Sequence, residues 1–103
     1  MEYKIDFTPI SWVKPLHGAR FKAYKQYGRQ LRLVEFTKEF IEPDWCMKGH
    51  IGYVLEGQME INFDGTKVIF DAGEGIFIPA GADHKHMAKV LTDKVKLILV
   101  ESV

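Results

Sequence analysis

The sequence predicts an all-β domain that folds as a small jelly-roll β-barrel. Residues 30–36 (QLRLVEF) alternate with the two-residue period of a strand. Asp64-Gly65 separates two further alternating runs, residues 59–63 and 66–70, and is a strong hairpin signal. No segment carries a helical stripe of ten or more residues. Eight or more short strands in a chain of 103 residues fit one barrel, so we expect a single domain over residues 1–103.

The amino-terminal quarter predicts one strand and one helical turn. Residues 1–13 alternate loosely between polar and apolar positions, which are Ile5, Phe7, Ile10 and Trp12. We expect this segment to cover an exposed edge of the sheet. Residues 22–28 (KAYKQYG) precede a glycine and are expected to form a short turn of helix.

The second half predicts three more strands. Residues 75–79 (GIFIP) form a short apolar run that must end at its proline, which has no N–H to donate to a sheet. The alternation of residues 84–91 (HKHMAKVL) puts His84 and His86 on one face. Residues 95–100 (VKLILV) are expected to close the barrel.

Composition excludes several classes of protein. The 14 Lys and Arg residues balance the 14 Asp and Glu residues, so neither nucleic acid nor an anionic membrane surface is the expected partner. No run approaches the roughly 18 apolar residues that a membrane span needs, and we expect a cytoplasmic protein. Cys46 is the single cysteine, so an intramolecular disulfide is impossible.

Two segments resemble the conserved motifs of the cupin superfamily. Gly73, Pro79, Gly81 and His84 are separated by five, one and two residues, as in the second cupin motif, and residues 49–61 (GHIGYVLEGQMEI) look like the end of the first. The resemblance covers about residues 38 to 90. It implies a small jelly-roll barrel, a homodimer and, as in many members, a divalent metal inside the barrel.

The resemblance can be carried over one position at a time. The first motif has two histidines one residue apart, a glutamate after three or four intervening residues, then six residues and a glycine. Counting back from Gly57 puts His50 at the glutamate position. With the three-residue spacing, Asp44 and Cys46 stand at the two histidine positions, whereas the four-residue spacing puts residues there that cannot bind metal. His84 matches the histidine of the second motif.

We therefore expect Cys46, His50 and His84 to bind one divalent metal ion (zinc, nickel, iron or manganese), with His86 or Asp44 in reserve. Two imidazoles and one thiolate leave a tetrahedral ion one open position, as in catalytic zinc sites. Each residue also has a plainer interpretation. The histidines could line a wet barrel mouth, Cys46 could be a small buried hydrophobe, and Asp44 could be a turn residue facing solvent.

Three functions fit these residues. The first is a barrel that binds a divalent metal and a small polar ligand, including a metal-dependent enzyme for isomerisation, oxygenation or lyase chemistry on a sugar-like or carboxylate substrate. Arg20 and Lys22 are candidates to reach a ligand carboxylate. The alternative is a metal-free module that binds or senses a small molecule, and the third is a dimeric structural domain without a ligand. The sequence does not decide whether the protein is an enzyme.

Overall fold

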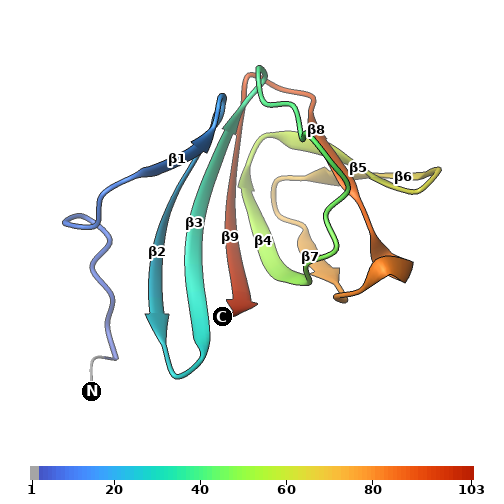
Figure 1. Cartoon of the computed structure of the whole chain (residues 1–103). Coiled ribbons are helices and arrows are strands. Elements are labelled where there is room, and N and C mark those ends of the chain that lie inside the picture. Colours follow the sequence, from blue (N-terminus) through green and yellow to red (C-terminus); the bar gives the residue numbers. More distant parts are fainter. Residues whose placement is uncertain (1–2) are drawn as a thin grey trace.

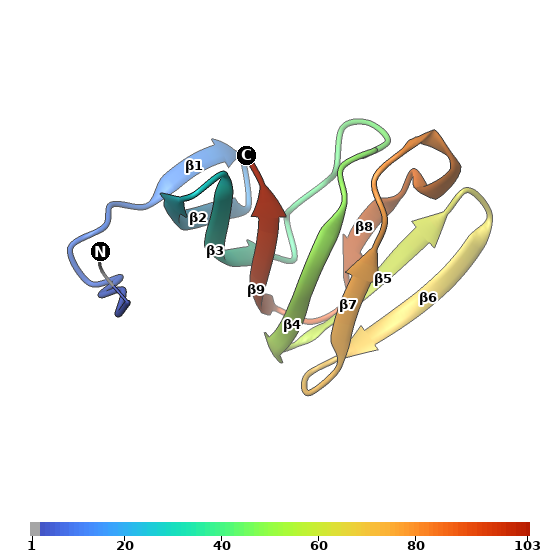
Figure 2. The same ribbon diagram turned by 90° about the horizontal axis from the view of Figure 1, so that it is seen from below.

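Two antiparallel sheets face each other in the computed structural model, which describes residues 3–103 (Figures 1 and 2). The first sheet has the strand order β1-β2-β3-β9-β4-β7 and the second the order β6-β5-β8. The all-β prediction is confirmed. The strands are β1 (Val13–Leu16), β2 (Ala19–Gln26), β3 (Arg29–Thr37), β4 (His50–Glu56), β5 (Gln58–Phe63), β6 (Thr66–Asp71), β7 (Gly75–Ile78), β8 (Met87–Val90) and β9 (Lys94–Ser102).

Two tight hairpins set the register of these sheets. Asp64 and Gly65 have φ angles of 53° and 108° and join β5 to β6, as the sequence predicts. Tyr27 and Gly28, with φ angles of 51° and 72°, join β2 to β3 in the same way. Positive φ at both central residues matches the right-handed twist of paired strands. The helical turn expected at residues 22–28 is therefore wrong, because residues 22–26 pair with β3 and residues 27–28 form the hairpin turn.

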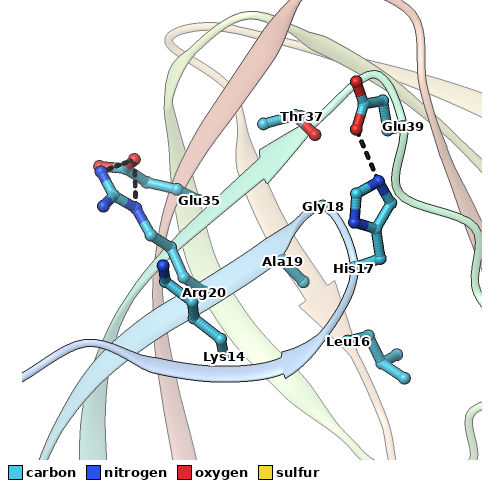
Figure 3. Close-up of a pocket in the computed structure, with 9 residues that line it drawn as sticks. All are labelled: Lys14, Leu16, His17, Gly18, Ala19, Arg20, Glu35, Thr37 and Glu39. Atoms are coloured by element: carbon cyan, nitrogen blue, oxygen red, sulfur yellow. Dashed lines mark hydrogen bonds and ion pairs between the residues drawn. The ribbon is translucent and has the colours of Figure 1, made fainter.

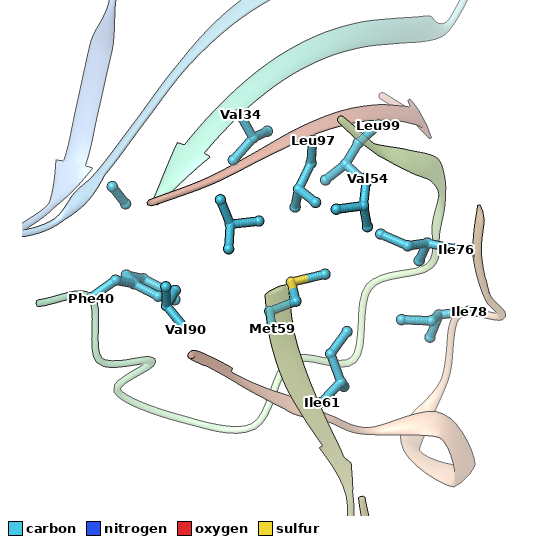
Figure 4. Close-up of a cluster of buried hydrophobic side chains, with 12 residues drawn as sticks. Val34, Phe40, Val54, Met59, Ile61, Ile76, Ile78, Val90, Leu97 and Leu99 are labelled. Carbon is cyan, nitrogen blue, oxygen red and sulfur yellow. The ribbon is translucent and has the colours of Figure 1, made fainter. Parts of the chain in front are cut away.

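The core lies between the two sheets and is built mainly by alternate residues of β4, β5, β7 and β9 (Figure 4). On β9, the inward positions Val95, Leu97 and Leu99 are all buried. They meet Met59 and Ile61 of β5 from the facing sheet. Burial of each such side chain contributes about 1.5–3 kcal/mol, so the alternation fixes which face of each strand turns inward.

The amino-terminal segment does not form the expected covering strand. Residues 3–12 of the described chain contain no strand, and residues 1–2 of the expected element lie outside the described part. Pro9 and a turn closed by the Ile10 N–H on the Phe7 carbonyl oxygen (3.1 Å) interrupt the extended run. The segment runs beside β2 instead, where Lys22 Nζ donates to the Phe7 carbonyl oxygen at 3.0 Å (Figure 1).

The connection from β7 to β8 departs from the predicted alternation. β7 ends before Pro79, as expected, but β8 begins only at Met87. Residues Ala82–His84 form one turn of 3-10 helix, in which the His84 N–H donates to the Gly81 carbonyl oxygen at 3.1 Å. This turn leaves His84 exposed to solvent, whereas His86 is buried at 3% exposure. The two histidines therefore do not share a face.

Gly81 starts this turn in a conformation that side chains disfavour, with φ 124° and ψ 164°. We predict that Gly81→Ala lowers the free energy of unfolding by about 1–3 kcal/mol, because this region of φ/ψ space is almost restricted to glycine. A Cβ there has no neighbour within 4 Å, so crowding does not contribute. Urea unfolding measures the loss. Gly75→Ala is the control, since its backbone is not in the positive-φ region, and equal losses in both variants would contradict the assignment.

Candidate metal centre in the barrel

Three potential metal ligands converge inside the barrel: Cys46, His50 and His86. One ligand atom from each lies within 4.8 Å of the others. His50 opens β4, and His86 immediately precedes β8. Cys46 comes from the loop before β4 and is paired with His86 through both backbone N–H···O bonds, at 2.8 and 2.9 Å. Backbone pairing thus brings the thiol and one imidazole together.

Both imidazole rings are oriented by acceptors at Nδ1. His50 Nδ1 lies 2.6 Å from Oε2 of Glu101, and His86 Nδ1 lies 2.9 Å from the carbonyl oxygen of His84. Since a carboxylate and a carbonyl only accept, each Nδ1 carries a hydrogen. Nε2 of His50 points to Cys46, whose Sγ is 3.6 Å away. The lone pair of each neutral ring is therefore on Nε2.

Glu101 is a buried carboxylate, 8% exposed, with a partner for each oxygen. Its Oε1 accepts a hydrogen bond from Gln30 Nε2 at 3.0 Å and lies 3.4 Å from Nη1 of Arg32. Its Oε2 binds His50. The guanidinium of Arg32 also stacks 4.6 Å from the ring centroid of Phe21. A buried charge needs such partners, so Glu101 is fixed as an anion behind His50.

These contacts shift the pKa values of the cluster. Burial lowers the pKa of His50, but the hydrogen bonds to Cys46 and Glu101 and the charge of Glu101 outweigh it and raise that pKa from 6.5 to about 9. The bond to His50 lowers the pKa of the Cys46 thiol. Burial lowers the pKa of His86. Without metal, His50 is thus protonated at neutral pH and His86 is neutral.

The cluster opens onto a cavity of about 430 Å³ inside the barrel. Its walls are largely apolar, with side chains of both sheets such as Phe36, Met59 and Leu97. Glu42 also lines it, and burial raises the pKa of this carboxyl. The cavity has the size of a small-molecule site, mostly apolar with a few polar groups.

The structure brings together two of the three residues expected to bind metal. Cys46 and His50 lie in the cluster, and the reserve His86 occupies the third position. His84 does not reach it, because the 3-10 turn exposes its side chain, and only its carbonyl oxygen contributes by holding His86. Asp44 is exposed and accepts the Trp45 N–H at 2.8 Å, which is the turn role given as its plainer interpretation.

The residues expected to reach a ligand carboxylate lie elsewhere. Arg20 binds Glu35 at 2.8 Å and stacks 3.9 Å from the centroid of the Trp12 ring. Lys22 lies 4.9 Å from the centroid of the same ring. Both side chains are therefore on the outer side of the first sheet, opposite to the cluster.

Sequence reasoning missed Glu101 and Arg32. Both could have been found from the two-residue period, because Glu101 continues the inward series of Leu97 and Leu99, and Arg32 precedes the buried Val34 by two positions. A charged residue in an inward series is the signal of a buried polar site.

A second cavity, of about 470 Å³, lies at the turn between β1 and β2 (Figure 3). His17 Nε2 is 2.6 Å from Glu39 there, but the two side chains are 82% and 70% exposed. Solvent weakens such a surface pair. Arg20 and Glu35 form the other pair of this cavity. The residues that line this second cavity include no buried group of thiol and imidazole side chains like the one formed by Cys46, His50 and His86.

Residues 47–101, more than half of the chain, match the family model of the cupin domain. The chain belongs to the cupin family. The search of curated proteins gave no match. This cupin also has no helix, within its described residues, that is long and apolar enough to cross a membrane.

Solved structures show the same jelly-roll fold. An RmlC-like cupin from Shewanella frigidimarina NCIMB 400 superposes with a TM-score of 0.74 at 19% identity, over 99% of this chain and 91% of that one. KdgF from Halomonas sp. gives 0.68 at 19% identity, over 90% and 86%. FeII HppE gives 0.74 at 13% identity, over 94% of this chain and 58% of that one. At these identities the similarity establishes the fold, and the jelly-roll prediction is confirmed.

We predict that Glu101→Gln lowers the pKa of His50 by about 1–3 pH units, because it removes the neighbouring negative charge. Stability from a raised histidine pKa is complete below the ordinary value of 6.5 and is lost as the pH rises to about 9. The metal-free parent should therefore lose stability between pH 6.5 and 9, and the variant should lose less. NMR titration of the His50 ring and urea unfolding across this range measure both effects.

Glu60→Gln is the matched control, because Glu60 belongs to the second sheet and forms none of the contacts of His50 described above. An unchanged His50 pKa in Glu101→Gln would contradict the role of the carboxylate.

Proposed function

We propose that this cupin binds one divalent metal ion through Cys46, His50 and His86, with a small polar ligand at the open coordination position. The observation that carries the proposal is the orientation of the two rings. Each imidazole gives its Nδ1–H to a fixed acceptor, so Nε2 is the nitrogen left to bind metal, and His50 must release its second proton when it does so. Partners of this kind, a carboxylate or a backbone carbonyl, are the usual second layer around metal-bound histidines.

The distance between the donor atoms of Cys46 and His50 supports a tetrahedral ion. Zinc bonds of about 2.3 Å to sulfur and 2.0–2.1 Å to nitrogen imply a sulfur–nitrogen separation of roughly 3.5 Å. Cys46 Sγ and His50 Nε2 are 3.6 Å apart. The remaining side of the cluster faces the interior cavity, which has room for a ligand. Three protein ligands and one open position are the arrangement of catalytic zinc sites.

The donor set favours a first-row transition metal. A thiolate and two imidazoles are softer than the oxygen ligands that magnesium, calcium and manganese prefer. Among the four expected ions, zinc, iron and nickel therefore fit this ligand set better than manganese does. Iron chemistry has a precedent on this fold, since one structural neighbour is FeII HppE.

The metal content of histidine and cysteine variants tests the proposal. We expect purified protein incubated with zinc to hold one ion per chain. Loss of an orienting partner typically weakens zinc binding 10–100-fold, so loss of a ligand in Cys46→Ala, His50→Ala or His86→Ala should exceed about 100-fold. Elemental analysis and competition with a chelator measure stoichiometry and affinity.

His84→Ala is the control for His86→Ala, because it keeps the backbone carbonyl that orients His86. Full zinc occupancy is expected in His84→Ala. A parent that takes up no zinc, nickel or iron would reject the proposal in favour of a metal-free binding module. Loss of zinc in His84→Ala but not in His86→Ala would reassign the third ligand to His84.

We also propose that the chain forms a homodimer through the outer face of the first sheet. Paired outward residues form an apolar row across four strands, which is Leu31, Val100, Ile51 and Phe77. Leu33, Ile98 and Tyr53 form a second row beside it. The outer face of the second sheet pairs Glu60 with Lys89 and Asn62 with Lys67 instead. A sheet that is apolar on both faces is typical of one covered on both sides.

Charges beside the apolar rows favour a second copy as the cover. Arg20, Glu35 and Lys96 follow each other on β2, β3 and β9, and Glu56 of β4 lies opposite Lys96. The order of signs is plus, minus, plus, minus. A two-fold axis parallel to the strands places the second copy with its strands in the reverse order, so its row of charges is minus, plus, minus, plus. Each charge of one copy then faces the opposite charge of the other copy, in an isologous contact.

Ile51→Asp should shift this cupin from dimer to monomer at micromolar concentration, because an unpaired carboxylate in the apolar rows is costly to bury. Ile69→Asp is the control. Ile51 and Ile69 are 48% and 51% exposed, but Ile69 lies on the polar outer face, opposite Glu60. Light scattering measures the mass of each. A monomeric parent, or equal dissociation by the two variants, would contradict the proposed interface.

A further inference from the structure

A groove of about 620 Å³ lies at the barrel end where β4 begins and β7 and β9 finish. Arg29, Gln30 and Ser102 line one side of it, and Phe77 lines the other. His50 and Glu101 also line this groove. It thus adjoins the metal centre from outside the interior cavity.

The groove and the interior cavity meet at Lys48 and His50. Both residues line both spaces, together with Met47 and Ile78. Lys48 directly precedes the Gly49-His50 entry into β4, so its side chain is carried by the same backbone as a proposed metal ligand. A molecule in the groove therefore lies against His50, a proposed ligand of the metal.

The groove has an excess of positive charge. Arg29 and Lys48 form no ion pair within residues 3–103. Glu101 is the one acidic residue in its lining, and its charge is already taken by Arg32 and His50. Two free cations beside a neutralised carboxylate make a local anion site in a chain whose net charge is +0.

We propose that this groove takes the carboxylate of a small organic acid, whose other oxygen-bearing end reaches the metal. The inference rests on the proposed metal centre. A divalent ion with one thiolate keeps one positive charge, the Arg32–Glu101 pair is neutral, and Arg29 and Lys48 add two more charges. Arg29 offers the fork of donors that matches a carboxylate, and Lys48 is a point charge that lines both the groove and the interior cavity. Pro79 and Ala80 supply an apolar wall for the carbon skeleton.

If the groove binds a carboxylate, neutral sugars are not among the ligands that it selects. The interior cavity has few polar groups and a largely apolar lining, so it offers few partners to the hydroxyl groups of a neutral sugar. The groove adds a requirement for negative charge at one end of the molecule. Binding should accordingly weaken as the salt concentration rises, since both cations are exposed.

Calorimetric titration of malonate and succinate into zinc-loaded and zinc-free protein tests the inference, with the neutral malonamide as the comparison. We expect malonate or succinate to bind and malonamide to bind at least about tenfold more weakly. Arg29→Ala and Lys48→Ala should each weaken the acid about tenfold. Lys94→Ala is the control, because Lys94 is exposed and lies away from the groove and the cavity.

Zinc content measured on every sample separates this inference from the metal proposal. Full zinc occupancy in Arg29→Ala and Lys48→Ala, together with weakened acid binding, supports the groove as the anion site. Acid binding that is unchanged in both variants overturns it, as does malonamide binding as tightly as malonate. Inorganic phosphate binding more tightly than either acid, with the same dependence on Lys48, also overturns the carboxylate assignment. A parent without zinc but with Lys48-dependent acid binding rejects the metal centre and keeps the groove.

Discussion

The 2.6 Å contact between Glu101 and His50 is the interaction on which the interior of this barrel depends. A carboxylate that is 8% exposed is stable only if its charge is compensated, and His50, Arg32 and Gln30 provide that compensation from the two neighbouring strands, β3 and β4. The same contact sets the tautomer of His50 and aims Nε2 at Cys46. One buried charge thus couples the packing of the sheet to the chemistry of the centre. Replacing it by an apolar residue would leave a guanidinium buried without its partner.

Much of the fold follows from local patterns. The Asp64-Gly65 hairpin, the end of β7 before Pro79 and the alternation of β9 are all encoded within a few residues. The helical turn expected at residues 22–28 failed because tertiary pairing with β3 overrides a weak local preference. Element type is predictable where the two-residue period is long and regular, and less so in short polar segments.

The candidate centre was harder to predict than the fold. Motif spacing found Cys46 and His50, but it assigned the third position to His84 on the assumption that the strand starts there. One turn of 3-10 helix moves His84 to the surface and leaves His86 in the cluster. Such a turn has no strong sequence signal beyond Gly81. The partners of His50 come from strands distant in sequence, such as Glu101, so only the register of the sheet could bring them together.

The position of β9 has a consequence for synthesis on the ribosome. This strand lies between β3 and β4, which precede it by many residues in the chain, and it pairs with both. Until residues 94–102 leave the exit tunnel, β3 and β4 have unpaired edges of the kind that recruit other chains. Before β9 pairs, the first sheet is therefore two separate parts, β1-β2-β3 and β4-β7, each with an unpaired edge. Glu101 arrives on the same strand, so closure of the sheet and completion of the centre are one event.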